Sequence, residues 1–202
     1  MCIRDRHIIA HQGASLDLPP NTIEAFQLAL DHGADIIELD IWRSMDGVWV
    51  VIHDRNLLRI TGVNKDITQM SFDEIQSLDA AYNFSDSSGN YLYRDKGYKI
   101  PSLEEVFKNF KNEKINIEIK DNRKLGLSDL VELIKKYQMQ QKTLFVSFYY
   151  SVIKEFRKVS KNEIATAASK SDIMRMIYFG KLPWYKICLL YTSDAADDMQ
   201  CV

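Results

Sequence analysis

Cysteine, glycine and proline are scarce in this chain, and long apolar runs are absent. Only 3 of the 202 residues are cysteines, and Cys2, Cys188 and Cys201 all lie near the ends. An odd number without motif spacing argues against a disulfide framework and against a zinc site. The 8 glycines and 4 prolines are too few for a fibrous or disordered composition. No apolar stretch reaches the roughly 18–20 residues that a membrane-spanning helix needs.

An excess of positive charge is also missing. The chain has 26 Lys and Arg against 28 Asp and Glu, a formal net charge of −2. Proteins that bind nucleic acid usually carry a basic patch or stripe, so we expect no nucleic-acid partner. With 46% apolar residues, the chain has ample material for one folded domain. The composition does not indicate an oligomeric state.

The two ends differ in character from the body. MCIRDR at 1–6 and CLLYTSDAADD at 188–198 resemble translated sequencing-adapter sequence, so we expect 1–6 and 188–202 to be non-native around a domain at 7–187. The alternative is an ordinary frayed N-terminus and a short tail. MCIRDR lacks the apolar stretch of a signal peptide, which favours a cytoplasmic location. A periplasmic or secreted location stays open if the native N-terminus is missing.

Strand-like and helix-like segments alternate through the body. The pattern predicts strands at 7–11, 35–41, 48–54, 115–120, 143–148 and 164–168, and helices at 21–32, 71–79, 103–111, 127–139, 150–160 and 170–180. Strands that alternate with helices of this length indicate βαβ units and a parallel sheet. Right-handed crossovers then place the helices outside. We therefore expect an α/β fold of the (β/α)₈ type, with six strands in the order of the sequence.

Acidic residues end two of the predicted strands, at the position where (β/α)₈ barrels build active sites. Glu38 and Asp40 share one face of their strand because side chains two residues apart point the same way. Glu118 ends the fourth predicted strand. Three converging carboxylates predict an oxygen-ligand site for Ca²⁺ or Mg²⁺. The alternative is a set of surface acids on an edge strand, but so apolar a strand in a parallel sheet is buried on both faces.

Basic and aromatic residues accompany these acids. His11 and His53 each leave a strand at the rim, and histidine is well suited to proton transfer near neutral pH. We expect the first and third strands to straddle the second, so that the two histidines flank a metal-bound phosphate as one base and one acid. Lys120 is a candidate phosphate contact, and Phe148 a candidate pocket wall. Asn21 is interpreted first as the cap of a helix, and second as a site residue.

Taken together, these residues resemble the glycerophosphodiester phosphodiesterases over roughly 7–180. The resemblance implies that Glu38, Asp40 and Glu118 hold one divalent cation. It also implies that His11 and His53 are the acid/base pair and that Lys120 holds phosphate. The motifs that carry it are HQG at 11–13, PPNT at 19–22, GAD at 33–35, ELD at 38–40, SMDG at 44–47, VVIHD at 50–54 and EIK at 118–120.

The chain departs from the family pattern in three respects. Gln12 stands where the family has Arg, which costs an always-charged, bidentate contact but leaves Gln12 as a neutral phosphate-binding candidate. Pro20 stands where the family has Glu. The family barrel has eight strands in about 250 residues, so six strands imply a TIM (β/α)₈ barrel truncated after about six strands. The edge of the first strand would then stay open.

Three functions follow from the resemblance. The first is metal-dependent hydrolysis of a small-molecule glycerophosphodiester to glycerol-3-phosphate and an alcohol such as choline or ethanolamine. The second is lysophospholipase D-type hydrolysis at the same site, which a long apolar lip would favour. The third is a catalytically inactive, phosphate-binding homologue or an inactive fragment, which Gln12 and Pro20 suggest.

Overall fold

The computed structural model describes residues 7–86 and 88–169 together with residues 172 and 174. The segments expected to be non-native, 1–6 and 188–202, lie outside the described residues, and so does most of the helix expected at 170–180. Within the described part of the chain, no helix combines the length and the apolar character that crossing a bilayer requires.

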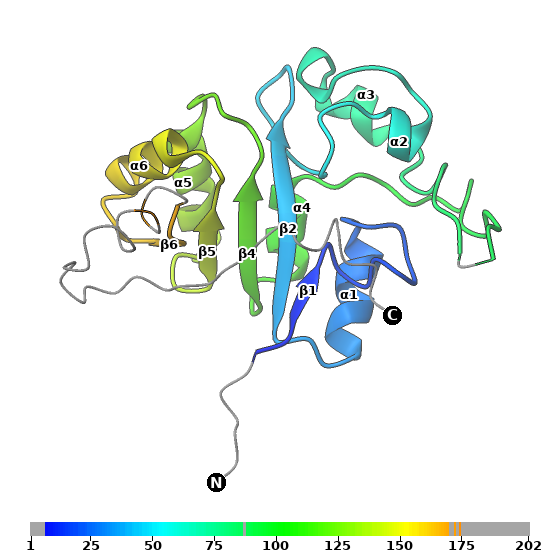
Figure 1. Cartoon of the computed structure of the whole chain (residues 1–202), viewed down its shortest axis with the longest axis horizontal. Helices are drawn as coiled ribbons and strands as arrows, with labels where there is room; N and C mark the ends of the chain where they lie inside the picture. Colours follow the sequence, from blue (N-terminus) through cyan, green and yellow to red (C-terminus); the bar gives the residue numbers. More distant parts are fainter. Residues whose placement is uncertain (1–6, 87, 170–171, 173, 175–202) are drawn as a thin grey trace, which may run out of the picture.

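From residue 103 onward, helices and strands alternate along the described chain, as the sequence pattern predicts, whereas two strands and then several short helices follow one another between residues 36 and 76 (Figure 1). Element boundaries lie within a few residues of the expected ones, and the sixth strand is short. The elements are, in chain order, β1 (Ile9–His11), α1 (Ile23–Asp31), β2 (Ile36–Arg43), β3 (Trp49–Val51), α2 (Leu58–Thr61), η1 (Ile67–Gln69), α3 (Phe72–Gln76), α4 (Leu103–Asn109), β4 (Lys114–Ile119), α5 (Leu127–Lys136), β5 (Thr143–Val146), α6 (Tyr150–Val159) and β6 (Ala165–Thr166).

A six-stranded sheet organises the molecule. Its main path runs β1-β2-β4-β5-β6, and every neighbouring pair on this path is parallel. β3 lies off the path and pairs antiparallel with β2. The expected number of strands is confirmed, but the expected order is wrong for β3.

The length of one loop explains the direction of β3. Residues 44–48 join β2 to β3, whereas a parallel crossover needs a dozen or more residues. β3 also lies along the same edge of β2 as β1. Ile52 N, just after β3, donates to Asp40 O at 2.9 Å, and Gln12 N, just after β1, donates to Glu38 O at 3.1 Å. Carbonyl groups two residues apart in a strand point to the same edge. β4 takes the opposite edge. The expectation that the first and third strands straddle the second is therefore wrong.

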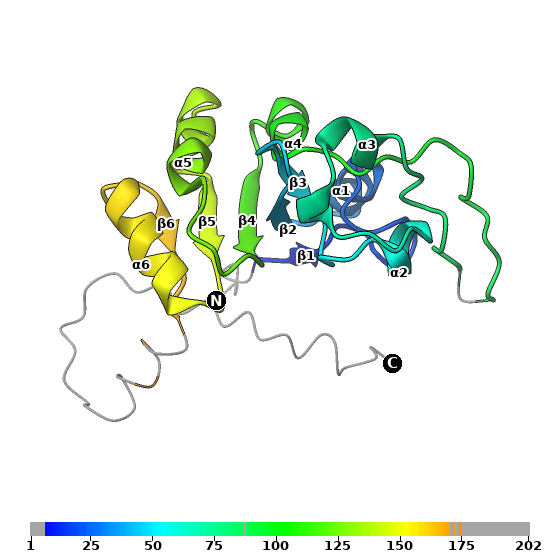
Figure 2. The ribbon, with the colours of Figure 1, turned by 90° about the horizontal axis from the view of Figure 1, so that it is seen from above.

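Helices α1, α4, α5 and α6 line one face of the curved sheet (Figure 2). Alternate residues of β2 and β4 point to this face, and Ile37, Leu39, Ile117 and their neighbours are buried there with residues of all four helices. Each such side chain contributes about 1.5–3 kcal/mol by leaving water. The alternate residues that point to the other face include the three predicted acids.

A second apolar cluster supports the segment between β3 and α4. It contains Val50, Ile52, Leu57, Ile67 and Ile75, all with no more than 1% of their surface exposed. Ser71 caps α3 in a capping box with Glu74. This cluster anchors the chain on both sides of the polar residues 53–56.

Candidate functional site

Three carboxylates converge at the C-terminal ends of β2 and β4. Asp40 is paired with Glu118 in the register of the two strands, and Glu38 precedes Asp40 by two residues on the same face. One oxygen of each residue lies within 4.8 Å of the others, and all three side chains are buried. The predicted convergence is confirmed. Hard oxygen donors at this spacing fit a divalent cation such as Ca²⁺ or Mg²⁺.

Buried acids of like charge need compensation. Burial raises the pKa of Glu38 well above its usual range, and the charges of Asp40 and Glu118 raise it further. The hydrogen bond from Gln12 N–H and the charge of the Lys120 ammonium act in the opposite direction and lower this pKa. Lys120 Nζ lies 3.2 Å from Asp40 Oδ1 and 3.1 Å from Glu118 Oε1. Lys120 thus neutralises part of the negative charge, and the donor set suits additional positive charge from a cation.

Two side-chain amides meet at one oxygen of Asp40. Gln12 Nε2 donates to Asp40 Oδ2 at 2.9 Å, and Asn21 Nδ2 donates to the same oxygen at 3.2 Å. Gln12, a predicted phosphate contact, is thus turned toward Asp40. The cap of α1 is Thr22, whose hydroxyl accepts from Ala25 N at 3.2 Å. The interpretation of Asn21 as that cap is therefore wrong.

His11 lies at the end of β1, beside the acids. Its Nε2 atom is 3.9 Å from Glu38 Oε2, and 46% of its side chain is exposed. The parallel register that pairs His11 with Glu38 explains this position. The ring is thus accessible to a substrate at the rim of the sheet.

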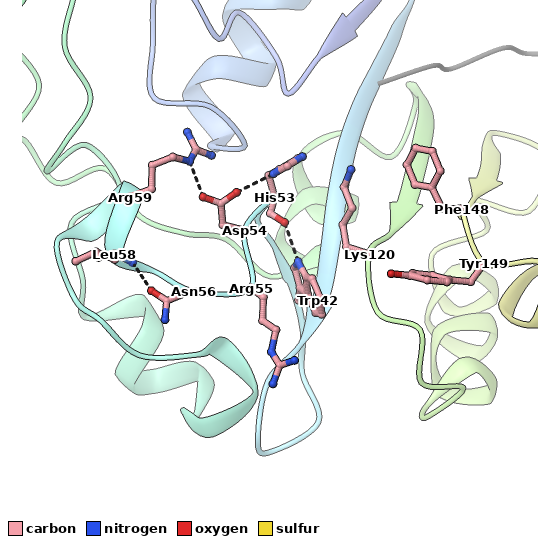
Figure 3. A pocket seen from close by; sticks show the side chains of 10 residues that line it. All are labelled: Trp42, His53, Asp54, Arg55, Asn56, Leu58, Arg59, Lys120, Phe148 and Tyr149. Carbon is pink, nitrogen blue, oxygen red and sulfur yellow. Dashed lines mark hydrogen bonds and ion pairs between the residues drawn. The ribbon is translucent and has the colours of Figure 1, made fainter. Parts of the chain in front are cut away.

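His53 reaches the same rim from the opposite direction. β3 runs back along β2, and the bond from Ile52 N to Asp40 O brings the next residue to the level of the acids. Trp42 Nε1 donates to His53 O at 2.8 Å. The His53 Nδ1 atom is 2.8 Å from Asp54 Oδ1, and Arg59 Nε donates to Asp54 Oδ2 (Figure 3). The ring is therefore held through its Nδ1 atom, which leaves Nε2 for chemistry.

His53 lies against the carboxylate of Asp54, which itself pairs with Arg59. The hydrogen bond to Asp54 raises the pKa of His53 against the effect of burial, and the charge of Asp40 raises it further. Burial raises the pKa of Asp54, but the hydrogen bonds from His53 and Arg59 outweigh it and hold that pKa well below its usual range. Neither Asp54 nor Arg59 has a role that is predicted from the sequence. The His-Asp dipeptide at 53–54 was the signal that could have found Asp54.

We expect the replacement Asp54→Asn to lower the pKa of His53. A pKa raised by folding stabilises the protein below the ordinary histidine value of 6.5, and this contribution is lost as the pH rises through the folded-state pKa. Asp54→Asn should therefore reduce the free energy of unfolding more at about pH 6 than at about pH 8. Urea unfolding at both pH values measures this, and an NMR titration of the ring measures the pKa.

The matched control is Asp66→Asn. Asp66 pairs with Arg55 in the same region, so its replacement removes an ion pair without touching His53. It should leave the pKa of His53 unchanged. An equal loss of stability at both pH values in Asp54→Asn would contradict the linkage.

A broad pocket of about 670 Å³ opens beside the acids. His53, Asp54 and Arg59 form one side, Phe148 and Tyr149 form the other, and Lys120 lies between them (Figure 3). Lys120 Nζ lies 5.7 Å from the centre of the Phe148 ring. The pocket is lined by Trp42, His53, Asp54, Arg55, Asn56, Leu58, Arg59, Lys120, Phe148 and Tyr149.

The chain is similar in sequence to known phosphodiesterases. The model of the glycerophosphoryl diester phosphodiesterase family matches residues 11–202. A glycerophosphodiester phosphodiesterase of Caldanaerobacter subterraneus is 35% identical over 158 residues, which are 76% of this chain and 62% of that protein. A human lysophospholipase D is 31% identical over 185 residues, which are 89% of this chain and 57% of that protein. The chain thus spans less than two thirds of the length of these relatives.

Solved structures share the fold. A glycerophosphodiester phosphodiesterase from Agrobacterium tumefaciens superimposes with a TM-score of 0.70 at 30% identity, over 80% of this chain and 66% of that one. An Oleispira antarctica phosphodiesterase, solved in complex with the product sn-glycerol-3-phosphate, gives 0.66 at 25% identity, over 87% and 72%. The described sheet is therefore part of a TIM (β/α)₈ barrel, as the sequence predicts.

Proposed function

Because the chain belongs to the glycerophosphoryl diester phosphodiesterase family, we propose that it hydrolyses glycerophosphodiesters to glycerol-3-phosphate and an alcohol, with the help of a divalent cation. The convergence of Glu38, Asp40 and Glu118 carries this proposal. The two histidines that meet at the same rim support it. Both the activity and the substrate are proposals for the whole protein, of which this chain spans a part.

The cation site and the phosphate contact come from neighbouring strands. Glu38, Asp40 and Glu118 would hold Ca²⁺ or Mg²⁺, which polarises a phosphoryl oxygen and screens its charge when bound. Lys120 lines the pocket and reaches the acids, so its ammonium group can contact a phosphate bound beside them. Gln12 is not among the residues that line the pocket, and its Nε2 atom donates to Asp40.

The two histidines divide the proton transfers. One takes a proton from the nucleophile, which is water or a substrate hydroxyl, and the other protonates the leaving alcoholate. His53 has the firmer support, because Asp54 holds Nδ1 and Trp42 holds the backbone carbonyl. His11 is more exposed and can approach substrate from the β1 side.

Metal removal tests the proposal. We expect a chelator such as EDTA to reduce choline release from glycerophosphocholine to background, because the cation supplies charge that the acids alone cannot. Added Ca²⁺ or Mg²⁺ should restore the rate, and Na⁺ at equal ionic strength should not. Turnover that persists in EDTA would contradict the role of the acids.

An apolar side of the pocket favours lysophospholipase D-type hydrolysis as a second candidate. Phe148 and Tyr149 are 48% and 42% exposed, and they form one side of the pocket (Figure 3). Such a wall can accommodate an acyl chain by burying it from water. A choline-release assay with glycerophosphocholine and lysophosphatidylcholine in parallel separates the two. Phe148→Ala should raise the KM for the lysolipid more than the KM for the small diester.

An inactive homologue is the third candidate. It would hydrolyse neither substrate at any cation concentration. Recovery of turnover in a variant with Gln12→Arg and Pro20→Glu would support this interpretation. In an active protein saturated with the cation, Gln12→Arg should instead lower the KM for small diesters, because Arg adds a charged phosphate contact.

A further inference from the structure

Gln12 and Asn21 both have a strained backbone conformation. Both adopt a left-handed conformation, with φ of 57° and 59°, which is uncommon for residues other than glycine. Both are buried, with 9% and 4% of their surface exposed. Strain of this kind persists only where surrounding structure holds it, and it is often found at functional sites.

Hydrogen bonds join the two residues to each other and to β2. Asn21 N donates to Gln12 O at 3.0 Å, and Gln12 N donates to the backbone and side-chain oxygens of Glu38, both at 3.1 Å. The Asn21 amide also contacts Asp40 twice, because its Oδ1 accepts from Asp40 N at 3.4 Å while its Nδ2 donates to Asp40 Oδ2. The orientation of the Asn21 amide is therefore determined from both ends.

The neighbouring glycine keeps this loop in place. Gly13 has φ of 81°, and a Cβ atom there would lie 2.7–2.9 Å from backbone atoms of Ala25 and Phe26 in α1. The loop therefore packs directly on the helix, and Gln12 is held at a fixed distance from β2.

We propose that Gln12 and Asn21 form an amide clamp that positions Asp40 as a cation ligand. The two amides occupy Asp40 Oδ2. Asp40 Oδ1 is buried without a hydrogen-bond partner among the described residues and lies 3.2 Å from Lys120 Nζ, which also contacts Glu118, so Oδ1 is the oxygen presented to the cation. Groups that orient a metal ligand by hydrogen bonding typically change metal affinity when they are removed. The neutral Gln12 amide does this without placing a positive charge beside a cation.

This inference rests on the proposed function, because it takes Asp40 as a cation ligand. The competing explanation is a purely structural tie between the β1–α1 loop and β2. A structural tie would change the stability of the protein and leave the intrinsic affinity for the cation unaltered. The affinity is therefore the decisive measurement.

Glycine variants separate the amide from the backbone. Asn21→Gly and Gln12→Gly accept the left-handed conformation but remove the amide. Matched controls exist elsewhere in the chain, since Asn162 and Gln138 have φ of 58° and 57°, are exposed and lie on other segments. Asn162→Gly and Gln138→Gly thus make the same chemical changes away from the acids.

Calorimetric titration of the full chain with CaCl₂ and with MgCl₂ tests the clamp. We expect Asn21→Gly and Gln12→Gly each to weaken binding by about 10–100-fold, and the two controls to bind like the unaltered protein. Gln12→Met, which keeps the size of the side chain without its donor, provides a second variant if a glycine variant does not fold. Circular dichroism verifies folding.

The outcomes distinguish the two proposals. If the unaltered chain binds neither cation, the cation-dependent function fails and the clamp fails with it. If the unaltered chain binds and the folded clamp variants bind within twofold of it, only the clamp is overturned. Weaker binding in the clamp variants alone supports the clamp, whether or not turnover is detected.

Discussion

Replacement of Asp40 with Asn is expected to abolish cation-dependent turnover and to leave a folded protein. The carboxylate is fully buried between Glu38 and Glu118, and its loss removes a charged ligand from the predicted cation site. A cation contributes several kcal/mol of transition-state stabilisation, so we expect turnover to fall about 10²–10⁴-fold or more. Choline release at saturating Ca²⁺ or Mg²⁺ measures the effect.

The thermal stability of this variant should change little. Removing the charge of Asp40 relieves its repulsion of Glu38 but also removes an ion pair with Lys120. The two effects oppose each other. Lys120 also retains its ion pair with Glu118, in which Nζ lies 3.1 Å from Oε1. Asp73→Asn, the same charge change at an exposed position in α3, is the control and should retain full activity. Normal cation-dependent turnover in Asp40→Asn would overturn the site.

Replacement of His11 or His53 with Ala should each reduce turnover by about 10²–10⁴-fold, the usual range for general acid–base catalysis. Both rings lie at one rim of the sheet, but the neighbouring residues hold them to different degrees. His53 is held by Asp54 and Trp42, whereas the His11 ring lies 3.9 Å from Glu38 Oε2. Initial rates at saturating substrate and cation give the comparison.

The pH profile provides an independent test of the pair. One histidine must be neutral and the other charged, so the rate should fall on both sides of an optimum. Each single variant should lose one limb of the profile. His32→Ala, at the C-terminal cap of α1, is a suitable control. Undiminished rates in both His11→Ala and His53→Ala would refute the mechanism, whatever the family resemblance implies.

Strand positions and the acid triad could be predicted from the sequence because both depend on local periodicity. In a buried parallel strand every second side chain shares a face, so Glu38 and Asp40 had to point together. Glu118 joined them because β2 and β4 are neighbours. Ser71 and Ser102 each precede a glutamate by three residues, and both form the capping box that this local spacing indicates.

The direction of β3 and the role of Asn21 could not be predicted in the same way. The apolar and β-branched residues of β3 predict a strand but not its direction, and only the short 44–48 loop indicates a hairpin. Asn21 satisfies the local preferences of a helix cap, but its partner Asp40 lies on another element. Contacts of this kind depend on tertiary packing, as does the arrangement in which Arg59 supports Asp54.

The central position of β2 has a consequence for the local dynamics of the site. Among the described strands, β2 pairs with three others, β1, β3 and β4. Local opening of an outer strand such as β6 therefore leaves the backbone of Glu38 and Asp40 hydrogen bonded, and the amides of β2 should be among the slowest to exchange with deuterium. Exchange of a bound ion would then proceed through side-chain motion in a rigid frame, without unfolding of the strand that carries its ligands.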